Sequence, residues 1–201
     1  MKADNLQSAL EHLRKDPVMR GLIEKYGRLE FRVHQEDLFA EIVDCIVSQQ
    51  LSGKVAAVIY SRFEGLFPEK KVQPEAILKI DDSKLRSVGI SWAKVKYIKD
   101  LAGKTIDGTL QLAKLASLPD EEVIEHLTQV KGIGRWTAEM ILMFTLRRPD
   151  VFSLGDLGLR TAVSQLYFVE RSDVIKIEEI SRQWSPHRSL ASRYLWKSLE
   201  E

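Results

Sequence analysis

A pair of glycines flanked by cations is the first feature of this sequence that could do chemistry. Gly132 and Gly134 lie on either side of one apolar residue, where one helix-like stretch ends and another begins. Glycines at such a place indicate backbone positions that cannot tolerate a Cβ atom, because φ is positive or because something approaches closely. The N–H groups that open the second helix would then point outward and suit a phosphate oxygen. A tight connection between two antiparallel helices is the alternative reading of an isolated Gly-x-Gly.

The neighbours of the glycines favour an anion site at this turn. Ile133 can fill the space between two helices, and positive charges stand on both sides of the pair. We therefore expect a helical hairpin at about residues 121–146. Its expected phosphate-binding residues are Lys131, Gly132, Gly134, Arg135 and Thr137. A Na⁺ or K⁺ ion could face the turn, with the carbonyls of Thr128, Val130 and Gly132 as its ligands.

Asp156 is the second candidate for chemistry. It follows the apolar pair Val151-Phe152 and stands just before an amphipathic stretch. An aspartate there would cap the N-terminus of a helix by default. The residues alone leave capping and catalysis equally open.

Helices must position both features. Apolar residues recur mainly at helical spacing, as in Leu6, Leu10 and Leu13, and few stretches alternate as a half-buried strand would. Breaks at glycine and proline divide the chain into roughly nine or ten helical segments. Only the stretch from Arg28 to Val33 could be extended, and it looks like a linker. The sequence therefore predicts an all-α protein.

Composition excludes several classes of protein. The single cysteine, Cys45, leaves no intramolecular disulfide and no four-cysteine iron–sulfur cluster or zinc site. The net charge is +1, so any contact with DNA would have to come from local geometry. No segment has the apolar length of a signal peptide or of a membrane span. We expect no membrane partner and a cytoplasmic location, or a nuclear one in a eukaryote.

Two motifs together resemble a known superfamily. The run Val130-Lys-Gly-Ile-Gly-Arg-Trp-Thr-Ala-Glu is followed about twenty residues on by Phe152-Ser-Leu-Gly-Asp-Leu-Gly-Leu-Arg. This pattern resembles the helix-hairpin-helix DNA glycosylases, and within them the 3-methyladenine DNA glycosylase II family. The resemblance extends from Asp16-Pro17 through Ser48-Gln-Gln-Leu-Ser to the tail between Trp184 and Trp196.

The resemblance implies a fold and a reaction. The fold has two helical subdomains with the active-site cleft between them: residues 37–150, which contain the hairpin, and residues 1–36 together with 151–201. The N-terminal β domain of some relatives is expected to be absent. Asp156 takes the place of the essential carboxylate, which would stabilise the positive charge that develops on the sugar as a glycosidic bond breaks. Purines such as 3-methyladenine and 7-methylguanine are cationic before cleavage, which reduces the need for a general acid.

Other residues acquire roles through the same resemblance. Trp136 stands where the strand-nicking members carry a lysine that forms a Schiff base, so we expect base removal without lyase activity. Gln50 aligns with the residue that fills the gap left by the flipped base, although the alignment could slip to Gln49. Arg188 could orient Asp156 or reach DNA.

The base pocket is the least defined part of the site. Aromatic walls would bind an electron-poor base, and ordinary core packing is an equal alternative for each aromatic. The candidates are Trp136, Trp184 and Tyr60, together with Met140 and Leu157, which stand where relatives often carry aromatics, and His187, which stands where at least one branch carries a tryptophan. No cofactor is expected to be required, and a monomer that acts on duplex DNA with alkylated bases is the expected form. A glycosylase for hypoxanthine, ethenoadenine or uracil, and a non-catalytic binder of damaged DNA, remain as alternatives.

Overall fold

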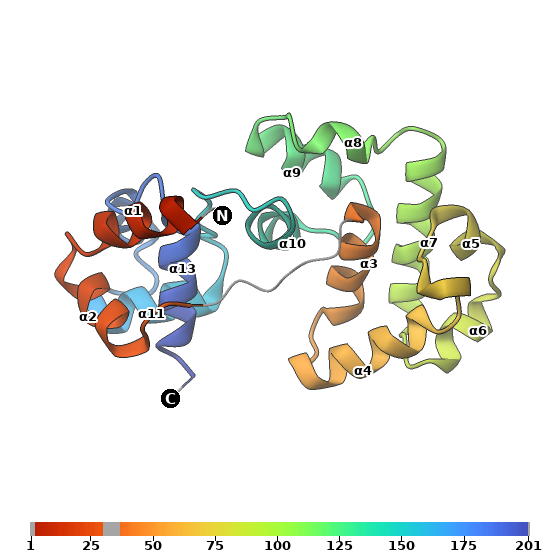
Figure 1. Ribbon diagram of the computed structural model, residues 1–201, viewed down its shortest axis with the longest axis horizontal. Coiled ribbons are helices and arrows are strands. Elements are labelled where there is room, and N and C mark those ends of the chain that lie inside the picture. Colours follow the sequence, from red (N-terminus) through yellow and green to blue (C-terminus); the bar gives the residue numbers. More distant parts are fainter. Residues whose placement is uncertain (1–2, 30–36, 201) are drawn as a thin grey trace. The chain divides into compact units, whose positions relative to one another are not determined.

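The computed structural model describes residues 3–29 and 37–200 (Figure 1). Within these ranges the chain forms thirteen α-helices and no strand, which confirms the predicted all-α class. The number exceeds the predicted nine or ten because α5, α6, α8 and α10 are helices of only four to six residues. Helical periodicity does not resolve such short elements.

Contacts divide the chain into two units. The central unit comprises residues 33–141, and the terminal unit comprises residues 1–32 and 142–201. The predicted boundary after residue 36 lies outside the described residues, as does most of the stretch expected to be extended. The second boundary falls after Ile141 rather than after Asp150. Residues 142–150 join the terminal unit because Phe144 packs on Trp196 and Asp150 pairs with Arg188.

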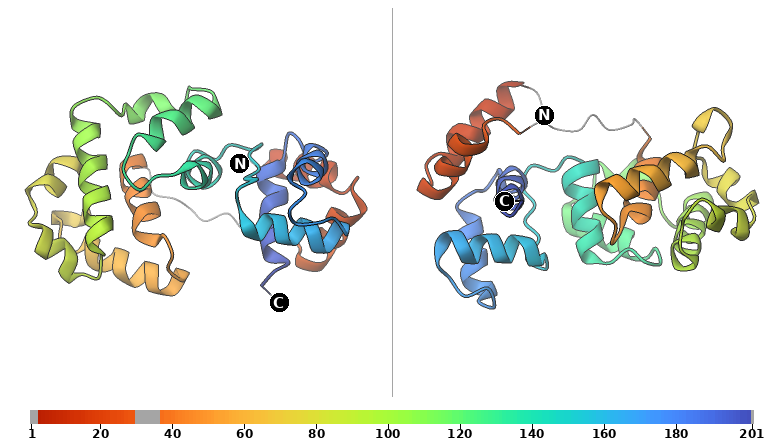
Figure 2. Two further views of the ribbon diagram at one scale, coloured as in Figure 1. Left: turned by 180° about the vertical axis from the view of Figure 1, so that it is seen from behind. Right: turned by 90° about the horizontal axis from the view of Figure 1, so that it is seen from below.

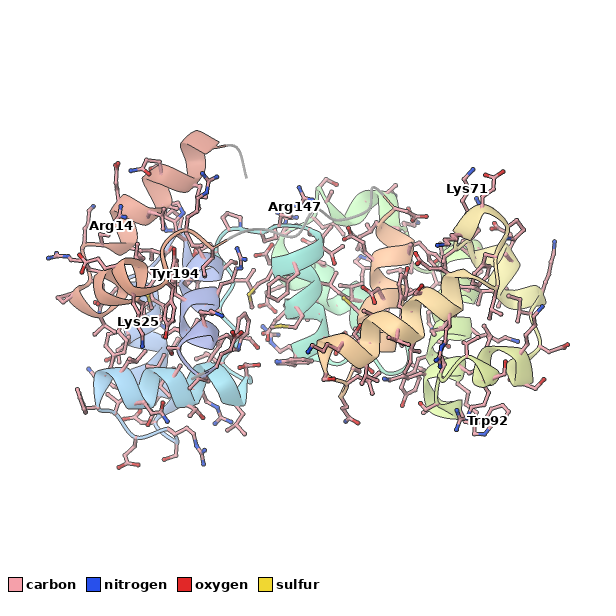
Figure 3. The ribbon with its side chains drawn as sticks, turned by 60° about the horizontal axis from the view of Figure 1, so that its bottom comes forward. Arg14, Lys25, Lys71, Trp92, Arg147 and Tyr194 are labelled. Atoms are coloured by element: carbon pink, nitrogen blue, oxygen red, sulfur yellow. The ribbon has the colours of Figure 1, made fainter. Side chains whose placement is uncertain are left out.

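The central unit is organised around one long helix. Its helices are α3 (Leu38–Ser48), α4 (Gly53–Glu64), α5 (Pro74–Lys79), α6 (Asp82–Ser87), α7 (Trp92–Ile106), α8 (Leu112–Leu115), α9 (Asp120–Thr128) and α10 (Arg135–Met140), with the 3₁₀ turn η1 at Pro68–Lys70. The 15-residue α7 packs against α3, α5 and α6 (Figures 1 and 2). Ser91 caps its first turn, and the side chain of Trp92 lies at the surface (Figure 3).

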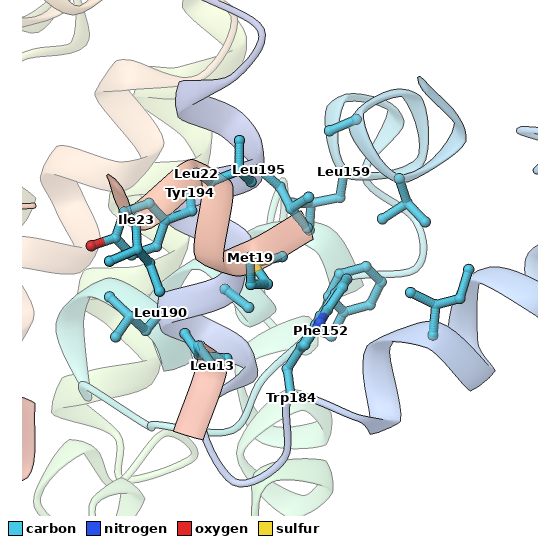
Figure 4. Close-up of a cluster of buried hydrophobic side chains, with 14 of the residues drawn as sticks. Leu13, Met19, Leu22, Ile23, Phe152, Leu159, Trp184, Leu190, Tyr194 and Leu195 are labelled. Carbon is cyan, nitrogen blue, oxygen red and sulfur yellow. The ribbon is translucent and has the colours of Figure 1, made fainter. Parts of the chain in front are cut away.

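The terminal unit joins both ends of the described chain in one core. It contains α1 (Ala3–Leu13), α2 (Pro17–Tyr26), α11 (Leu157–Tyr167), α12 (Val174–Arg182) and α13 (Arg188–Lys197), and α13 packs against α2 and α11. Met19, Leu159 and Tyr194 are among its buried side chains (Figure 4). Asp16 caps α2 and also accepts hydrogen bonds from the Trp184 indole and from a tyrosine hydroxyl of α11. This partly buried carboxylate thereby connects the N-terminal helices to the C-terminal ones.

No helix in the described ranges combines the length and the apolar character that crossing a membrane requires.

Candidate functional site

The predicted hairpin is present. Helix α9 ends at Thr128, α10 begins at Arg135, and the π-helical turn η2 continues α10 over Ile141–Thr145. Ile133 is buried in the turn, as expected from its place between the two helices. The hairpin thus occupies residues 120–145, within one residue of the prediction at either end.

The two glycines of the hairpin differ in what they require. Gly132 has φ of +80°, and a Cβ atom there would overlap the ring of Tyr97, so both predicted reasons for a glycine hold. Gly134 has φ of −89°, and an added Cβ would meet no described atom within 4 Å. Nothing in the described parts of the chain therefore explains why the second position is a glycine.

Helix α7 fixes the hairpin turn through a carboxylate. Asp100 Oδ2 accepts hydrogen bonds from the Lys131 N–H at 2.9 Å and from Lys104 Nζ at 2.7 Å. Burial alone would raise the pKa of Asp100, but the hydrogen bonds from Lys104 and Lys131 hold it below its ordinary value. The Lys131 side chain is 71% exposed, and its ammonium lies 3.5 Å from Asp100 Oδ1. This lysine can reach outward from the turn.

Arg135 forms ion pairs with carboxylates of both hairpin helices. Its guanidinium forms a pair of hydrogen bonds with Glu121, at 3.0 and 2.6 Å, and its Nε donates to Glu139 at 3.1 Å. The hydrogen bonds with Glu121 raise the pKa of Arg135. The side chain thus joins the two helices of the hairpin while remaining 59% exposed, and its role as a phosphate ligand stays a prediction.

The main chain at the start of α10 retains the geometry of an anion site. The first bond of the helix runs from the Ala138 N–H to the Gly134 carbonyl at 3.0 Å. The N–H groups of Arg135, Trp136 and Thr137 therefore precede the helical ladder, at the positive end of the helix dipole. The Thr137 side chain is buried, and its hydroxyl accepts a hydrogen bond from Gln49 at 3.4 Å, so only its N–H remains a candidate phosphate ligand.

Two of the carbonyls suggested for a monovalent cation already accept hydrogen bonds. Val130 accepts from the Ile133 N–H at 3.1 Å, and Gly132 accepts from Gln49 Nε2 at 3.0 Å. A carbonyl oxygen has two lone pairs, so these bonds are compatible with a further ligand. The Na⁺ or K⁺ site, which would also use Thr128, stays a prediction.

The turn between α3 and α4 separates the roles of its two glutamines. Gln49 is tied by its amide to the hairpin, at the Gly132 carbonyl. Gln50 is exposed and has φ of +57°, a left-handed conformation that is uncommon for residues other than glycine. Of the two wedge candidates that the sequence left open, Gln50 is the one whose side chain is presented to solvent.

Asp156 caps α11, as its place in the sequence predicted. Its Oδ1 accepts a hydrogen bond from the Leu159 N–H at 2.7 Å and another from Trp196 Nε1 at 3.0 Å. The residue is 8% exposed. A Cβ atom on Gly158 would lie 3.1 Å from this oxygen and 3.2 Å from the indole, so glycine leaves room for the indole against the carboxylate. Capping and a further role of this aspartate are compatible.

Trp196 and Phe144 are site residues that were not predicted. Their rings pack 5.8 Å apart at an angle of 34°, with the indole N–H directed to Asp156. Trp196 closes the tail that resembles the glycosylase family, which was the available signal. Phe144 stands in the apolar run of η2 at the end of the hairpin, and no spacing distinguishes it from a core residue.

Two predicted pocket residues belong to the cores instead. Trp184 is 0% exposed, packs near Phe152 and Tyr167, and donates its indole N–H to Asp16 (Figure 4). Tyr60 is buried in the central unit and donates its hydroxyl to the Ala40 carbonyl at 3.0 Å. Because their polar groups are satisfied in the interior, the prediction that they line a base pocket is wrong, and the core-packing alternative holds.

Arg188 pairs with a different aspartate from the one expected. Its Nε donates to Asp150 Oδ1 at 2.8 Å, and its terminal nitrogen donates to the Asp150 carbonyl at 2.8 Å. Of the two roles suggested for Arg188, the orientation of Asp156 is therefore wrong, and contact with DNA stays a prediction. Partial burial would raise the pKa of Asp150, but hydrogen bonds from Arg188 and Ser185 hold it below its ordinary value.

The remaining pocket candidates lie in two different units. Trp136, 46% exposed, and the half-buried Met140 are in the central unit, whereas Leu157, 56% exposed, and His187 are in the terminal unit. His187 meets the ring of His12 edge-on at 5.4 Å, and partial burial with the nearby His12 lowers its pKa. The assignment of these four residues to one pocket stays a prediction.

Fold and sequence together define the class of this protein. The sequence pattern of the HhH-GPD superfamily of base excision DNA repair proteins matches residues 43–187, which include the hairpin and Asp156. The chain belongs to this superfamily, and the resemblance identified from its motifs is confirmed.

Relatives narrow the comparison. The chain is 37% identical over 176 residues to DNA-3-methyladenine glycosylase 1 of Schizosaccharomyces pombe, covering 83% of this chain and 74% of the relative. The solved structure of the 3-methyladenine DNA glycosylase of that yeast in complex with abasic DNA superposes with a TM-score of 0.85 at 32% identity, covering 96% of this chain and 97% of the other. The crystal structure of a DNA-3-methyladenine glycosidase from Bacillus halodurans superposes with a TM-score of 0.81 at 35% identity, covering 94% of this chain and 88% of the other.

Proposed function

We propose that this protein is a monofunctional DNA glycosylase that flips alkylated purines out of duplex DNA and hydrolyses their N-glycosidic bond. The observation that carries the proposal is Asp156, a carboxylate at the start of α11 that lies within the region matched by the superfamily, is only 8% exposed and accepts a hydrogen bond from the Trp196 indole. The names of the relatives, DNA-3-methyladenine glycosylases, support the choice of substrate.

The chemistry needs one well-held anion. As the base leaves, positive charge develops on the sugar, and a fixed carboxylate stabilises that charge more strongly in a water-poor site than it could in solution. The same carboxylate can orient the attacking water. Because 3-methyladenine and 7-methylguanine are cationic before cleavage, they leave as neutral bases without protonation by the protein.

The hairpin would anchor the DNA backbone. The N–H groups that open α10 and the exposed ammonium of Lys131 suit a phosphate oxygen. Close approach of that phosphate would account for Gly134, where the protein itself leaves room for a Cβ. The likeness to a glycosylase solved with abasic DNA supports this docking.

We propose base removal without strand cleavage. Trp136 occupies the position of the Schiff-base lysine, two residues after Gly134, and an indole cannot attack the sugar. The protein would act as a monomer, without a required cofactor, wherever the cell keeps its DNA: the cytoplasm of a bacterium or the nucleus of a eukaryote.

The direct test uses methylated duplex DNA. The purified protein should release free 3-methyladenine and 7-methylguanine, and the strand should remain intact on a gel until alkali is added. Substrates with hypoxanthine, ethenoadenine or uracil serve as comparisons. If only hypoxanthine, ethenoadenine or uracil were released, the substrate would be that lesion and not an alkylated purine. Binding to damaged duplex with no release of any base would make the protein a non-catalytic binder.

A further inference from the structure

One face of α7 touches both turns that the proposed function uses. Lys94, Tyr97 and Asp100 are spaced three residues apart, so they follow one side of the helix. Lys94 contacts the turn that carries Gln50, and the other two contact the hairpin. All of these contacts lie inside the central unit.

Lys94 holds the main chain at the end of α3. Its ammonium donates to the carbonyls of Val47 at 2.8 Å and Gln49 at 2.6 Å, the residues around the C-terminus of that helix. A cation is favourable at this negative end of the helix dipole. The ammonium is also partly desolvated, since burial lowers the pKa of Lys94. Both acceptors belong to the backbone, so the lysine sets the path of the chain that enters Gln50.

The other end of the same face holds the hairpin. The ring of Tyr97 fills the space that a side chain on Gly132 would need, and Asp100 accepts the Lys131 N–H. Gln49 connects the two turns directly, because its amide donates to the Gly132 carbonyl at 3.0 Å and lies 3.4 Å from the Thr137 hydroxyl. The two turns are thereby bound to α7 and to each other.

We infer that Lys94 is a positioning residue that, with the Gln49 amide, fixes the Gln50 turn at a set distance from the hairpin. This inference rests on the proposed function, in which Gln50 enters the gap left by a flipped base. Gln50 has a left-handed backbone conformation, which persists only when its surroundings impose it. Lys94 and Gln49 impose it, so that Gln50 is in place before the base is extruded and no ordering has to accompany flipping.

The test measures the contact of Gln50 with the orphaned base and does not depend on base excision. The probe is a duplex that contains a tetrahydrofuran abasic-site analogue opposite 2-aminopurine, whose fluorescence reports contact with the orphaned base. Anisotropy of a labelled end gives the affinity of the same duplex. Lys94→Met is compared with Lys96→Met, which removes the same charge from an exposed position on the same helix.

If Lys94 positions the Gln50 turn, Lys94→Met and Lys96→Met should differ in the 2-aminopurine signal. At saturating protein, Lys94→Met should lose at least about half of the 2-aminopurine signal while its affinity changes less than about threefold, and Lys94→Arg should regain most of it. Lys96→Met should match the parent. Equal signals from Lys94→Met and Lys96→Met would overturn the inference while leaving the proposed function intact.

A second variant covers the case in which Lys94→Met does not fold. Gln49→Glu keeps the size of the side chain but places a carboxylate against the Gly132 carbonyl, which should break the connection between the turns and reduce the signal by at least about half. A parental signal from Gln49→Glu would overturn the inference. If the parent protein itself does not bind the probe duplex, the proposed function fails, and the inference fails with it.

Discussion

One oxygen of Asp156 accepts hydrogen bonds from a helix N–H and from the Trp196 indole N–H. The first bond is that of an ordinary helix cap, which the position of Asp156 in the sequence predicts. The second joins residues forty positions apart. It turns a capping residue into a carboxylate whose orientation is fixed from two directions, which is what electrostatic stabilisation of a developing cation requires.

The indole bond can be removed without removing the ring. Trp196→Phe should lower the single-turnover excision rate by about tenfold, since a hydrogen bond to a charged group contributes roughly 1.5–3 kcal/mol. The packing against Phe144 should largely survive, so the affinity for DNA should change much less than the rate. Quench-flow excision and anisotropy on the same duplex measure the two quantities. A variant with the parental rate would show that the indole does not position the carboxylate.

The pair formed by Asp150 and Arg188 makes stability depend on pH. The pKa of Asp150 is held below its ordinary value in the folded protein, so the stabilisation is present above the unfolded aspartate's pKa and is lost as the pH falls through the folded one. Asp150→Asn should lower the free energy of unfolding by about 1 kcal/mol at pH 7, a modest amount because the pair is partly exposed. The difference from the parent should close progressively below about pH 4. Urea unfolding at a series of pH values measures it, and a constant difference would contradict the assignment.

At the residue scale the sequence could identify groups but not their partners. Asp156 and the hairpin glycines were found because they stand in local motifs. The association of Arg188 with Asp150 spans 38 positions, and no local pattern distinguishes it from the expected one with Asp156. Trp184 and Tyr60 show the same limit, because an aromatic side chain that bonds inside a core looks in the sequence like one that faces a ligand.

Among the elements, the bounds of the hairpin could be predicted to within one residue, but the contacts of α7 that hold its turn could not. Gly132 and Gly134 mark the turn, and the apolar spacing marks the helices on either side. The dependence of the turn on α7 could not be read, because Tyr97 and Asp100 precede it by more than thirty residues. Short helices such as α8 were also missed, since four residues carry no periodicity.

The two glycines provide a matched pair of substitutions. Gly132→Ala should lower the free energy of unfolding by about 2–4 kcal/mol, because φ is positive and the new methyl group overlaps Tyr97. Gly134→Ala should change stability by less than about 1 kcal/mol, since φ is ordinary and the described surroundings leave room.

Although Gly134→Ala should affect stability less than Gly132→Ala does, it should clearly weaken DNA binding. Gly134→Ala should weaken binding to a duplex with an abasic-site analogue by about tenfold, because the methyl group stands where the phosphate approaches. Thermal unfolding and anisotropy measure the two effects side by side. A Gly134→Ala protein with parental affinity would show that no phosphate closes on this position.

For the whole molecule, the composition does not indicate a nucleic-acid partner, whereas the division into two helical units agrees with the family resemblance. A net charge of +1 gives no sign of a nucleic-acid partner, and only the local motifs do. The division into two helical units was expected from the family resemblance, but its second boundary lies after Ile141 rather than after Asp150. The aromatic and ionic contacts that draw residues 142–150 into the terminal unit are long-range and carry no signal in the sequence.

The weak overall charge predicts a shallow salt dependence. A protein that holds phosphates mainly through backbone N–H groups and few free cations releases few counterions. Affinity for an abasic-site duplex should fall only about tenfold between 50 and 200 mM salt, which corresponds to roughly two neutralised phosphates, rather than the ~10³–10⁵ of strongly basic binders. A logarithmic slope steeper than about −5 would mean that cationic side chains dominate binding.

The role of the Asp156 carboxylate in base excision is tested by the single-turnover release of 3-methyladenine from methylated duplex DNA by Asp156→Asn. Asparagine can cap α11 and accept the indole bond, so the fold should be preserved. The matched control is Asp173→Asn, which changes the exposed cap of α12. We expect release to fall at least about 100-fold for Asp156→Asn with binding retained, and to stay at the parental level for the control. Undiminished release by a folded Asp156→Asn protein would show that the carboxylate of Asp156 does not carry the reaction.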